Sequence, residues 1–183
     1  GWWTGISAAD LDSDGRMDLV AGNWGLNGAE RASSRQPLRL YFGDLMERGT
    51  VDLLETEYDG DSTEPMPARR LSDLGTALPV LRQRFPSHRA WAGSSARSIL
   101  GHFKGVQEVA ASTFATAIFL NRRERFESQP LPREAQLSPI WSVSVSDFDG
   151  DGDEDIFLGQ NFLGVSPEHS RIDAGRGLLL RND

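Results

Sequence analysis

Residues 147–155 read Asp-Phe-Asp-Gly-Asp-Gly-Asp-Glu-Asp, an acidic stretch between two apolar runs. A second copy lies at residues 10–18, which read Asp-Leu-Asp-Ser-Asp-Gly-Arg-Met-Asp. The two copies, which we call loop 1 (10–18) and loop 2 (147–155), share aspartate at positions 1, 3, 5 and 9 and glycine at position 6. Two intact copies of one acidic pattern indicate that the chain is built from repeats.

The apolar flanks of the two loops repeat as well when the loops are aligned. Ile6 and Ala8 alternate with small or polar neighbours, as in a half-buried strand, and the run after loop 1 ends at Gly22, too soon for a helix. Each loop is therefore expected to join two antiparallel strands. The alignment matches Ile6 with Val143, Ala8 with Val145, Leu11 with Phe148, Leu19 with Ile156, and Gly22 with Gly159.

A third, degenerate copy lies at residues 44–52. Asp44, Gly49 and Asp52 occupy positions 1, 6 and 9, but positions 3 and 5 are Met46 and Arg48. Two metal ligands are lost and a cationic side chain enters the loop. We expect the same hairpin here without the metal.

Residues 61–108 break the β pattern and are expected to form a short helical insertion. Pro79 divides the segment into two short helices, because proline interrupts helical hydrogen bonding. Ser72 is expected to cap the first helix, and Ser94 or Ser95 to cap a later turn. The apolar residues at helical spacing are Leu74, Leu78, Leu81 and Phe85.

The β pattern returns after the insertion. Residues 113–120 and 126–131 are expected to pair across a polar turn. Residues 177–182 resemble the strand that ends at Asn121. The chain is therefore expected to stop one strand short of completing its last unit.

The acidic loops have the chemistry of a calcium site. Ca²⁺ takes about 6 to 8 oxygen ligands, and aspartates two residues apart converge as the chain curls around the ion. The positive φ of the turn would come from Gly15 and Gly152. We predict one Ca²⁺ in each loop. The ligands are the side chains of Asp10, Asp12, Asp14 and Asp18 with the carbonyl of Arg16, and the side chains of Asp147, Asp149, Asp151 and Asp155 with the carbonyl of Asp153.

Two other interpretations of the loops are weaker. An EF-hand needs glutamate at position 12, where this chain has Ala21 and Leu158, and flanking helices. Ordinary acidic turns, whose aspartates hydrogen-bond only nearby amides, would leave several carboxylates in mutual repulsion without a cation. We expect the calcium to stabilise the hairpin and not to bridge to a ligand directly.

The composition fits one domain with its own core, residues 1–183, since 38% of the residues are hydrophobic and 25% charged. The net charge of -8 argues against nucleic acid, which needs a basic surface. The sequence has no transmembrane segment of about 20 apolar residues, and its start lacks the features of a signal peptide, so a removed leader or a fragment is expected. The absence of cysteine excludes thiolate metal sites and disulfides.

The pattern of strand, acidic loop and strand, with Gly22 and Gly159 ending the second strands, resembles the FG-GAP or VCBS-type repeat of integrin α-subunit β-propellers and of many bacterial secreted proteins. More narrowly, GWWTGI (1–6), AGNWGLN (21–27) and QNFLGV (160–165) look like the propellers of bacterial proteins related to the cartilage acidic protein and ASPIC/UnbV group. The helical insertion after the degenerate loop fits the same subgroup.

The resemblance implies an all-β fold, a β-propeller of four-stranded blades with calcium loops between the first two strands of a blade. At about 60 residues per blade, the chain makes about three blades, whereas a closed propeller usually has about four to eight. We therefore expect either a larger parent chain or a homo-oligomer to complete the ring.

The resemblance also implies a non-catalytic, exported module, extracellular, cell-surface or periplasmic, for adhesion or for binding a protein or glycan ligand. One alternative is a calcium-assisted polysaccharide lyase, in which the ion neutralises a uronate carboxylate. No cluster of lysine, tyrosine and histidine supplies the base for it. The other alternative is a structural module whose free strand edges pair with another chain.

The remaining candidate residues favour structural roles. His88, His102 and His169 are too scattered for a metal or acid-base motif, and residues 122–125 are expected to form a solvated charged turn. Trp91, in the insertion, is the tryptophan expected to be most exposed. The tryptophans that flank the acidic hairpins, for which packing is favoured over carbohydrate stacking, are Trp2, Trp3, Trp24 and Trp141.

Overall fold

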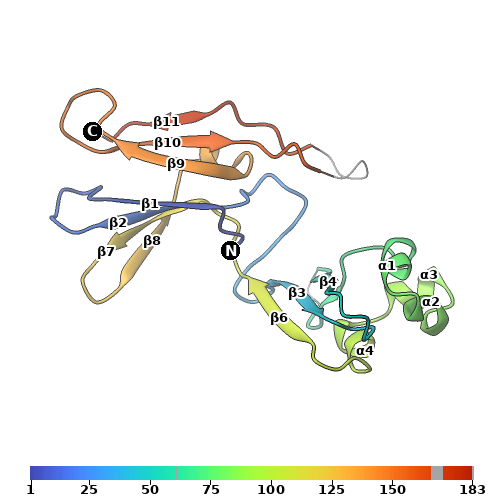
Figure 1. Cartoon of the computed structure of the whole chain (residues 1–183). Coiled ribbons are helices and arrows are strands. Elements are labelled where there is room, and N and C mark those ends of the chain that lie inside the picture. Colours follow the sequence, from blue (N-terminus) through green and yellow to red (C-terminus); the bar gives the residue numbers. More distant parts are fainter. Residues whose placement is uncertain (61, 166–170, 183) are drawn as a thin grey trace. The chain divides into compact units, whose positions relative to one another are not determined.

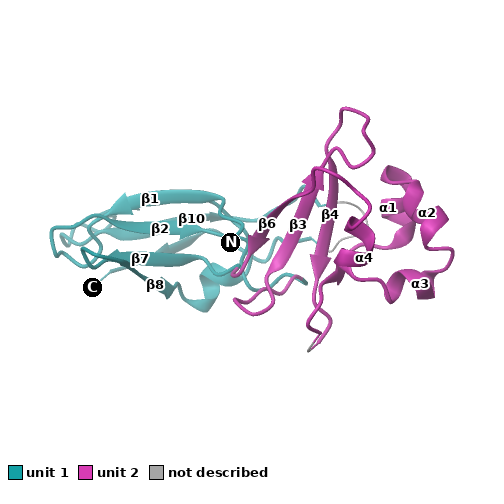
Figure 2. Cartoon of the chain, turned by 90° about the horizontal axis from the view of Figure 1, so that it is seen from below, with its two compact units in different colours: residues 1–29, 114–183 teal, residues 30–113 magenta. Residues whose placement is uncertain are grey.

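The computed structural model describes residues 1–60, 62–165 and 171–182, and the chain is mostly β with four short α-helices among these residues. It divides into two compact units (Figure 2). Unit 1 comprises residues 1–29 and 114–183, and unit 2 comprises residues 30–113. Three antiparallel sheets are formed, and none of them closes on itself within the described ranges.

Unit 1 contains two sheets. The N-sheet has the strand order β1-β2-β7-β8, and the C-sheet has the order β11-β10-β9. Unit 2 is thus inserted between the second and third strands of the N-sheet (Figure 1). The strands are β1 (Gly5–Ala9), β2 (Asp18–Gly22), β7 (Ala117–Asn121), β8 (Phe126–Pro130), β9 (Ile140–Ser146), β10 (Asp155–Gln160) and β11 (Leu178–Leu180), with a 3₁₀ turn at Arg133–Gln136.

The two hairpins of unit 1 pair in the same register when their loops are aligned. Ala8 pairs with Leu19 across β1 and β2, and the residues matched to them, Val145 and Ile156, pair across β9 and β10. The third strands, β7 and β11, also correspond. Ile118 pairs with Val20 in the N-sheet, and Leu179 pairs with Phe157 in the C-sheet.

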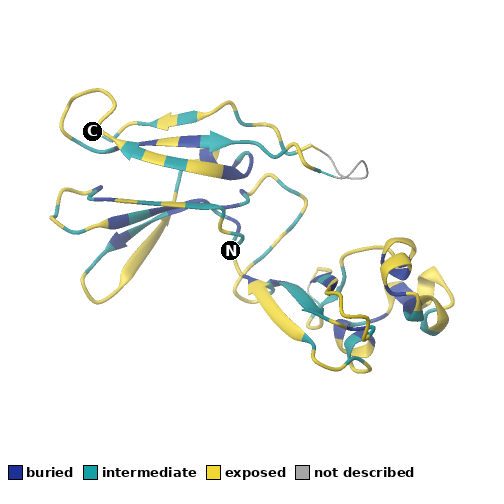
Figure 3. Ribbon diagram, in the orientation of Figure 1, coloured by how far each residue is buried: buried dark blue, intermediate teal, exposed yellow. Residues whose placement is uncertain are grey.

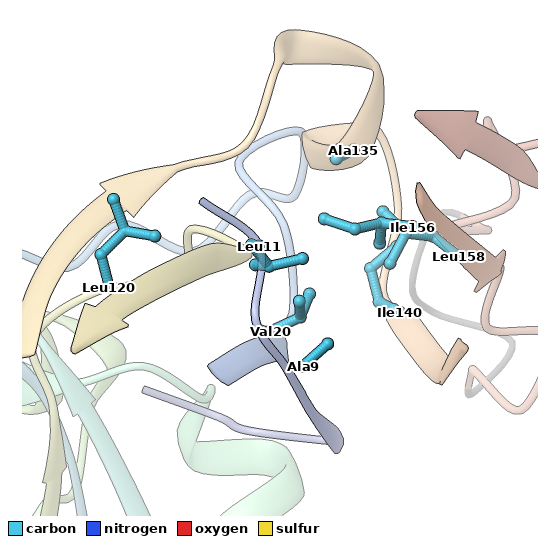
Figure 4. Packing of buried hydrophobic residues seen from close by; sticks show 8 residues of the cluster. All are labelled: Ala9, Leu11, Val20, Leu120, Ala135, Ile140, Ile156 and Leu158. Carbon is cyan, nitrogen blue, oxygen red and sulfur yellow. The ribbon is translucent and has the colours of Figure 1, made fainter. Parts of the chain in front are cut away.

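The two sheets of unit 1 pack face to face over one apolar core. Figure 4 shows side chains of the N-sheet and its loop 1 facing side chains of the C-sheet. Gly22 is required at this interface, because a Cβ there would lie 2.8 Å from Cγ2 and 2.9 Å from Cβ of Ile140. The buried core residues are Ala9, Leu11, Val20, Leu120, Ala135, Ile140, Ile156 and Leu158.

Unit 2 has a separate core between a sheet and helices. Its sheet has the order β5-β4-β3-β6, and the degenerate loop 44–52 joins β3 to β4 as an antiparallel hairpin. Leu54 and Leu81 are fully buried in this core. The elements are β3 (Leu38–Gly43), β4 (Asp52–Glu57), β5 (Met66–Pro67), β6 (Gln107–Ala111), α1 (Leu71–Ala77), α2 (Val80–Arg84), α3 (His88–Ala92) and α4 (Ala96–Leu100).

The four helices lie inside the range predicted to be helical, and two of the predicted boundaries are confirmed. Pro79 separates α1 from α2, and Ser95 caps α4 through a reciprocal capping box with Ser98. The prediction for Ser72 is wrong. The N-cap of α1 is Arg70, and the Ser72 hydroxyl bonds to Asp73.

The exposure predicted for Trp91 is also wrong. Its side chain is 5% exposed and packs in the core of unit 2, where its ring lies 5.2 Å from that of Phe85. The indole N–H donates to the Arg69 carbonyl at 3.0 Å, so its polar atom is satisfied inside the core. Trp3 and Trp141, by contrast, are 45% and 46% exposed. Figure 3 shows how buried positions concentrate inside each unit.

None of the helices in the described part of the chain has the length and apolar character that a membrane span requires.

We expect Gly22→Ala to lower the free energy of unfolding by about 1–3 kcal/mol, because the added methyl group overpacks the contact with Ile140. Urea denaturation measures this. The matched control is Gly5→Ala at the position paired with Gly22, where a Cβ meets Trp141 O at an ordinary 3.5 Å. Equal effects of the two substitutions would contradict the close approach of the sheets at Gly22.

Candidate metal centre

All three acidic loops close their turns in the same way. The position 1 aspartate accepts hydrogen bonds from backbone amides further along the loop. In loop 1, Asp10 accepts from Asp14 N at 3.0 Å and from Gly15 N at 2.8 Å. In loop 2, Asp147 accepts from Gly150 N at 2.6 Å and from Gly152 N at 3.1 Å.

The position 6 glycines have the predicted left-handed backbone. φ is +82° at Gly15, +102° at Gly152 and +76° at Gly49. Residues with side chains rarely adopt these values, whereas glycine does so at no steric cost. The degenerate loop shares the turn, since Asp44 accepts from Arg48 N and Gly49 N, both at 2.7 Å.

The position 9 aspartates, Asp18 and Asp155, are fully buried, and each of their oxygens accepts one backbone amide. Asp18 Oδ2 accepts from Leu11 N at 3.0 Å, and its Oδ1 accepts from Asn121 N at 2.7 Å. Asp155 repeats this pattern with Phe148 N at 3.1 Å and Asn182 N at 2.9 Å. Each carboxylate therefore connects its own loop to the end of the third strand of its sheet. The connected residue is Asn121, the last residue of β7, in the N-sheet and Asn182, two residues beyond β11, in the C-sheet.

Three carboxylates converge in each intact loop. Carboxylate oxygens of Asp10, Asp12 and Asp18 lie within 4.8 Å of one another, and so do those of Asp147, Asp149 and Asp151. The structure thus brings together three of the four predicted carboxylate ligands in each loop. Each carboxylate oxygen has two lone pairs, so an oxygen that accepts one amide can still face a cation.

The two remaining predicted carboxylates have other partners. Asp14 forms an ion pair with Arg16, whose backbone N–H also donates to Asp14 Oδ1 at 2.9 Å. Asp155 is committed to the amides of Phe148 and Asn182. The Asp151 carboxylate accepts from Asp153 N at 3.0 Å, the same local contact that Asp14 makes in loop 1.

An arginine from the neighbouring strand end pairs with each loop. Arg122 Nη1 contacts Asp12 and lies 3.6 Å from Asp14 Oδ2, and Arg181 contacts Asp149. Two hydrogen bonds raise the pKa of the Arg122 guanidinium. The bond to Asp12 has the larger effect, and the bond to Glu127 adds to it. Arg122 is therefore part of the loop 1 cluster, whereas the rest of the predicted solvated turn, residues 123–125, is exposed. These two cations offset part of the carboxylate repulsion.

Loops 1 and 2 lie side by side at one end of unit 1, the left-hand end in Figure 1. Ser13 Oγ donates to Asp153 Oδ1 at 3.3 Å, and Asn182 Nδ2 donates to Leu11 O at 2.8 Å. The predicted sites are thus neighbours in space, although the loops lie near opposite ends of the sequence.

The degenerate loop, for which no metal was predicted, contains a cationic side chain that pairs with its position 9 aspartate. Arg48 Nη2 lies 2.8 Å from Oδ1 of Asp52, the buried position 9 aspartate, and 3.0 Å from the carbonyl of Ala77 at the end of α1. Met46, at position 3, packs against the core of unit 2. The two carboxylates missing from this loop are thus replaced by a cation at position 5, Arg48, and by a core residue at position 3, Met46.

Among the described histidines, neither His88 nor His102 joins an acidic loop. His88 and His102 are exposed in unit 2, and His169 lies outside the described residues. Two residues that do join the loops, Asn121 and Asn182, were not identified from the sequence as donors to the buried aspartates. Their equivalent positions at the ends of matched strands were the available signal.

Asp18→Asn is expected to lower the free energy of unfolding by about 1–3 kcal/mol without any metal, because one buried amide then faces an N–H₂ group instead of an acceptor. Asp12→Asn, at an exposed position whose partner is Arg122, is expected to cost less than about 1 kcal/mol. Urea denaturation in EDTA compares the two. Equal losses would contradict the structural role of the buried carboxylate of Asp18.

Arg48→Ala is expected to destabilise unit 2 by about 1–3 kcal/mol, because it leaves the Asp52 carboxylate buried without its cation. Asp52 Oδ2 already has no hydrogen-bond partner among the described residues. Arg69→Ala is the control, since Arg69 pairs with Glu55 at a more exposed site and should cost less than about 1 kcal/mol. Urea denaturation compares the two variants, and a loss for Arg48→Ala no larger than for the control would rule out this role of the guanidinium.

No family model, curated protein or solved structure matches this chain. The site is therefore interpreted from its own geometry, in which two equivalent hairpins each gather three carboxylates.

Proposed function

We propose that the chain is a calcium-binding, non-catalytic β-propeller module of an exported protein, which serves adhesion or binds a protein or glycan ligand. The observation that carries the proposal is the repeated hairpin loop with three convergent carboxylates in each copy. The exported location and the binding role are supported by the resemblance to FG-GAP and VCBS-type repeats.

The ligand chemistry supports calcium. The convergent groups are all carboxylates, and hard oxygen ligands in a flexible loop suit Ca²⁺ better than they suit metals that prefer nitrogen or sulfur. The ligand side chains are partly exposed or exposed, except for the buried Asp18. Water molecules and the carbonyls of Arg16 and Asp153 would supply the ligands still needed for a coordination number of about 6 to 8.

The arrangement of the sheets supports propeller blades. The N-sheet is a four-stranded antiparallel sheet with strands in chain order, and the C-sheet repeats its first three strands in the same register. The sheets also pack face to face, as neighbouring blades do. In this proposal unit 2 is an insertion in one blade, and the ring is completed by further blades from a larger parent chain or from other copies.

A structural role for the ion follows from the position of the loops. Each loop joins the first two strands of a sheet and is tied to the third strand through its position 9 aspartate. A cation held by the three convergent carboxylates of a loop would reduce the repulsion within this turn, so binding would stabilise the folded sheet over the unfolded chain.

We expect Ca²⁺ to raise the melting temperature relative to EDTA, with a gain of about 2.7 kcal/mol for each site when the free ion is about 100 times its dissociation constant. Differential scanning calorimetry with Ca²⁺, Mg²⁺ and EDTA measures it, and Mg²⁺ should act more weakly because it demands a tighter octahedral site.

Asp149→Asn should remove part of the calcium-dependent gain. Glu124→Gln, which removes an exposed carboxylate from the turn between β7 and β8, should retain all of it. A melting temperature that is the same in Ca²⁺ and in EDTA would refute calcium binding.

A further inference from the structure

The two sheets of unit 1 pack with non-equivalent faces. The C-sheet contacts the N-sheet through one face, which we call face 1. The N-sheet contacts the C-sheet through a face that is not the equivalent of face 1 but lies on the other side of the sheet. We call it face 2, and on the N-sheet it contains Val20, Ile118 and Leu120. Face 1 of the C-sheet consists of Val143, Val145, Ile156, Leu158, Leu178 and Leu180.

The internal repeat locates face 1 on the N-sheet. Matching β9, β10 and β11 with β1, β2 and β7 transfers the six residues onto the N-sheet. The pairing confirms that they share one side of the sheet, since they form two rows across the three strands. The rows are Ile6, Ala21 and Ala117, and Ala8, Leu19 and Phe119.

All six residues on this face of the N-sheet are apolar, and part of the face is open. Ile6 is 67% exposed although it lies within β1. Trp3, which is 45% exposed, extends the surface, with its ring 5.6 Å from that of Phe119. An apolar sheet face with such exposed residues is typical of an interaction surface.

The C-sheet carries the complementary surface. Its face 2 contains the row Ser144, Phe157 and Leu179, in which Phe157 is 42% and Leu179 is 47% exposed. The equivalent row of the N-sheet is Ser7, Val20 and Ile118, which lies under face 1 of the C-sheet. The chain itself therefore shows which kind of surface covers a face 2.

We propose that a second copy of this chain docks head to tail, with face 2 of its C-sheet against face 1 of the N-sheet. Both surfaces lie on one chain and consist of apolar and hydroxyl side chains, as does the interface inside unit 1. The contact is heterologous, so it can continue to further copies. The proposal rests on the interpretation of the sheets as propeller blades but not on calcium binding.

Sedimentation velocity and light scattering test the proposal with the full chain. We expect the wild type to associate with rising concentration. Ile6→Arg and Phe157→Arg should each raise the dissociation constant at least about tenfold, because each places a charge in one surface. Leu163→Arg is the control, since Leu163 is 71% exposed in unit 1 and lies on neither face. It should associate like the wild type.

A mixture of the two variants gives the decisive result. Ile6→Arg keeps an intact face 2, and Phe157→Arg keeps an intact face 1, so an equimolar mixture should form a heterodimer that neither variant forms alone. Failure to complement, or a wild type that stays monomeric up to its solubility limit, would overturn the proposal. Far-UV circular dichroism verifies folding, and Trp3→Arg replaces Ile6→Arg if that variant does not fold.

The experiment is run in Ca²⁺ and in EDTA to separate the two proposals. Association in both media without a calcium-dependent melting temperature would refute the metal proposal and support head-to-tail docking. A calcium-dependent melting temperature in a protein that stays monomeric would support the metal proposal and refute the docking.

Discussion

Two buried carboxylates, those of Asp18 and Asp155, hold the loop end of unit 1 together. A buried charge is stable only when its oxygens are hydrogen-bonded, and here each oxygen receives a backbone amide. One amide comes from the carboxylate's own loop and the other from the end of the third strand. The same bonds satisfy amides that would otherwise be orphaned where the strand ends. Each aspartate thus fixes three strands through one side chain.

This bond pattern divides the acidic loop into two parts. Both oxygens of the position 9 aspartate accept backbone amides, whereas the aspartates at positions 3 and 5 lie beside an arginine. Arg122 and Arg181 partly neutralise positions 3 and 5 from the adjacent strand end, which makes the closely spaced carboxylates tolerable. In the degenerate loop the positive charge that pairs with a buried aspartate comes from Arg48, a residue of the loop itself. The three loops therefore share one fold and differ in the source of positive charge.

Much of unit 1 was predictable because its signals are local. The alternation around Ile6 and the matching residues around Val145 specify the two hairpins and their register, since a one-residue slip would invert each face. Pro79 and Ser95 likewise act within one helical turn. The predicted start of the strand at residue 113 was too early, because the chain before Ala117 bonds elsewhere, as in the contact of Gly25 N with Phe114 O at 2.8 Å.

The contacts that could not be predicted join distant residues. Asn121 lies far from Asp18 in the sequence because the whole of unit 2 is inserted between the second and third strands of the N-sheet, and the pairing of those strands brings the two residues together. No local pattern indicates that partner. Trp91 was misjudged for a similar reason. A tryptophan in a short polar helix looks exposed, but its burial depends on Phe85 and on the Arg69 carbonyl, which tertiary folding brings to it.

The way the two sheets pack depends on the contacts that each matched glycine makes. Gly22 lets Ile140 approach the backbone of the N-sheet, and Thr4 Oγ1 donates a hydrogen bond to the Ile140 carbonyl at the same point. The equivalent glycine of the C-sheet, Gly159, has Ser142 beside it instead. The sheets are therefore alike in register but differ in which face is already filled. Because face 1 meets face 2 and not another face 1, adding sheets in the same sense always leaves one face of each kind at the two ends. Such a stack ends only when it closes into a ring.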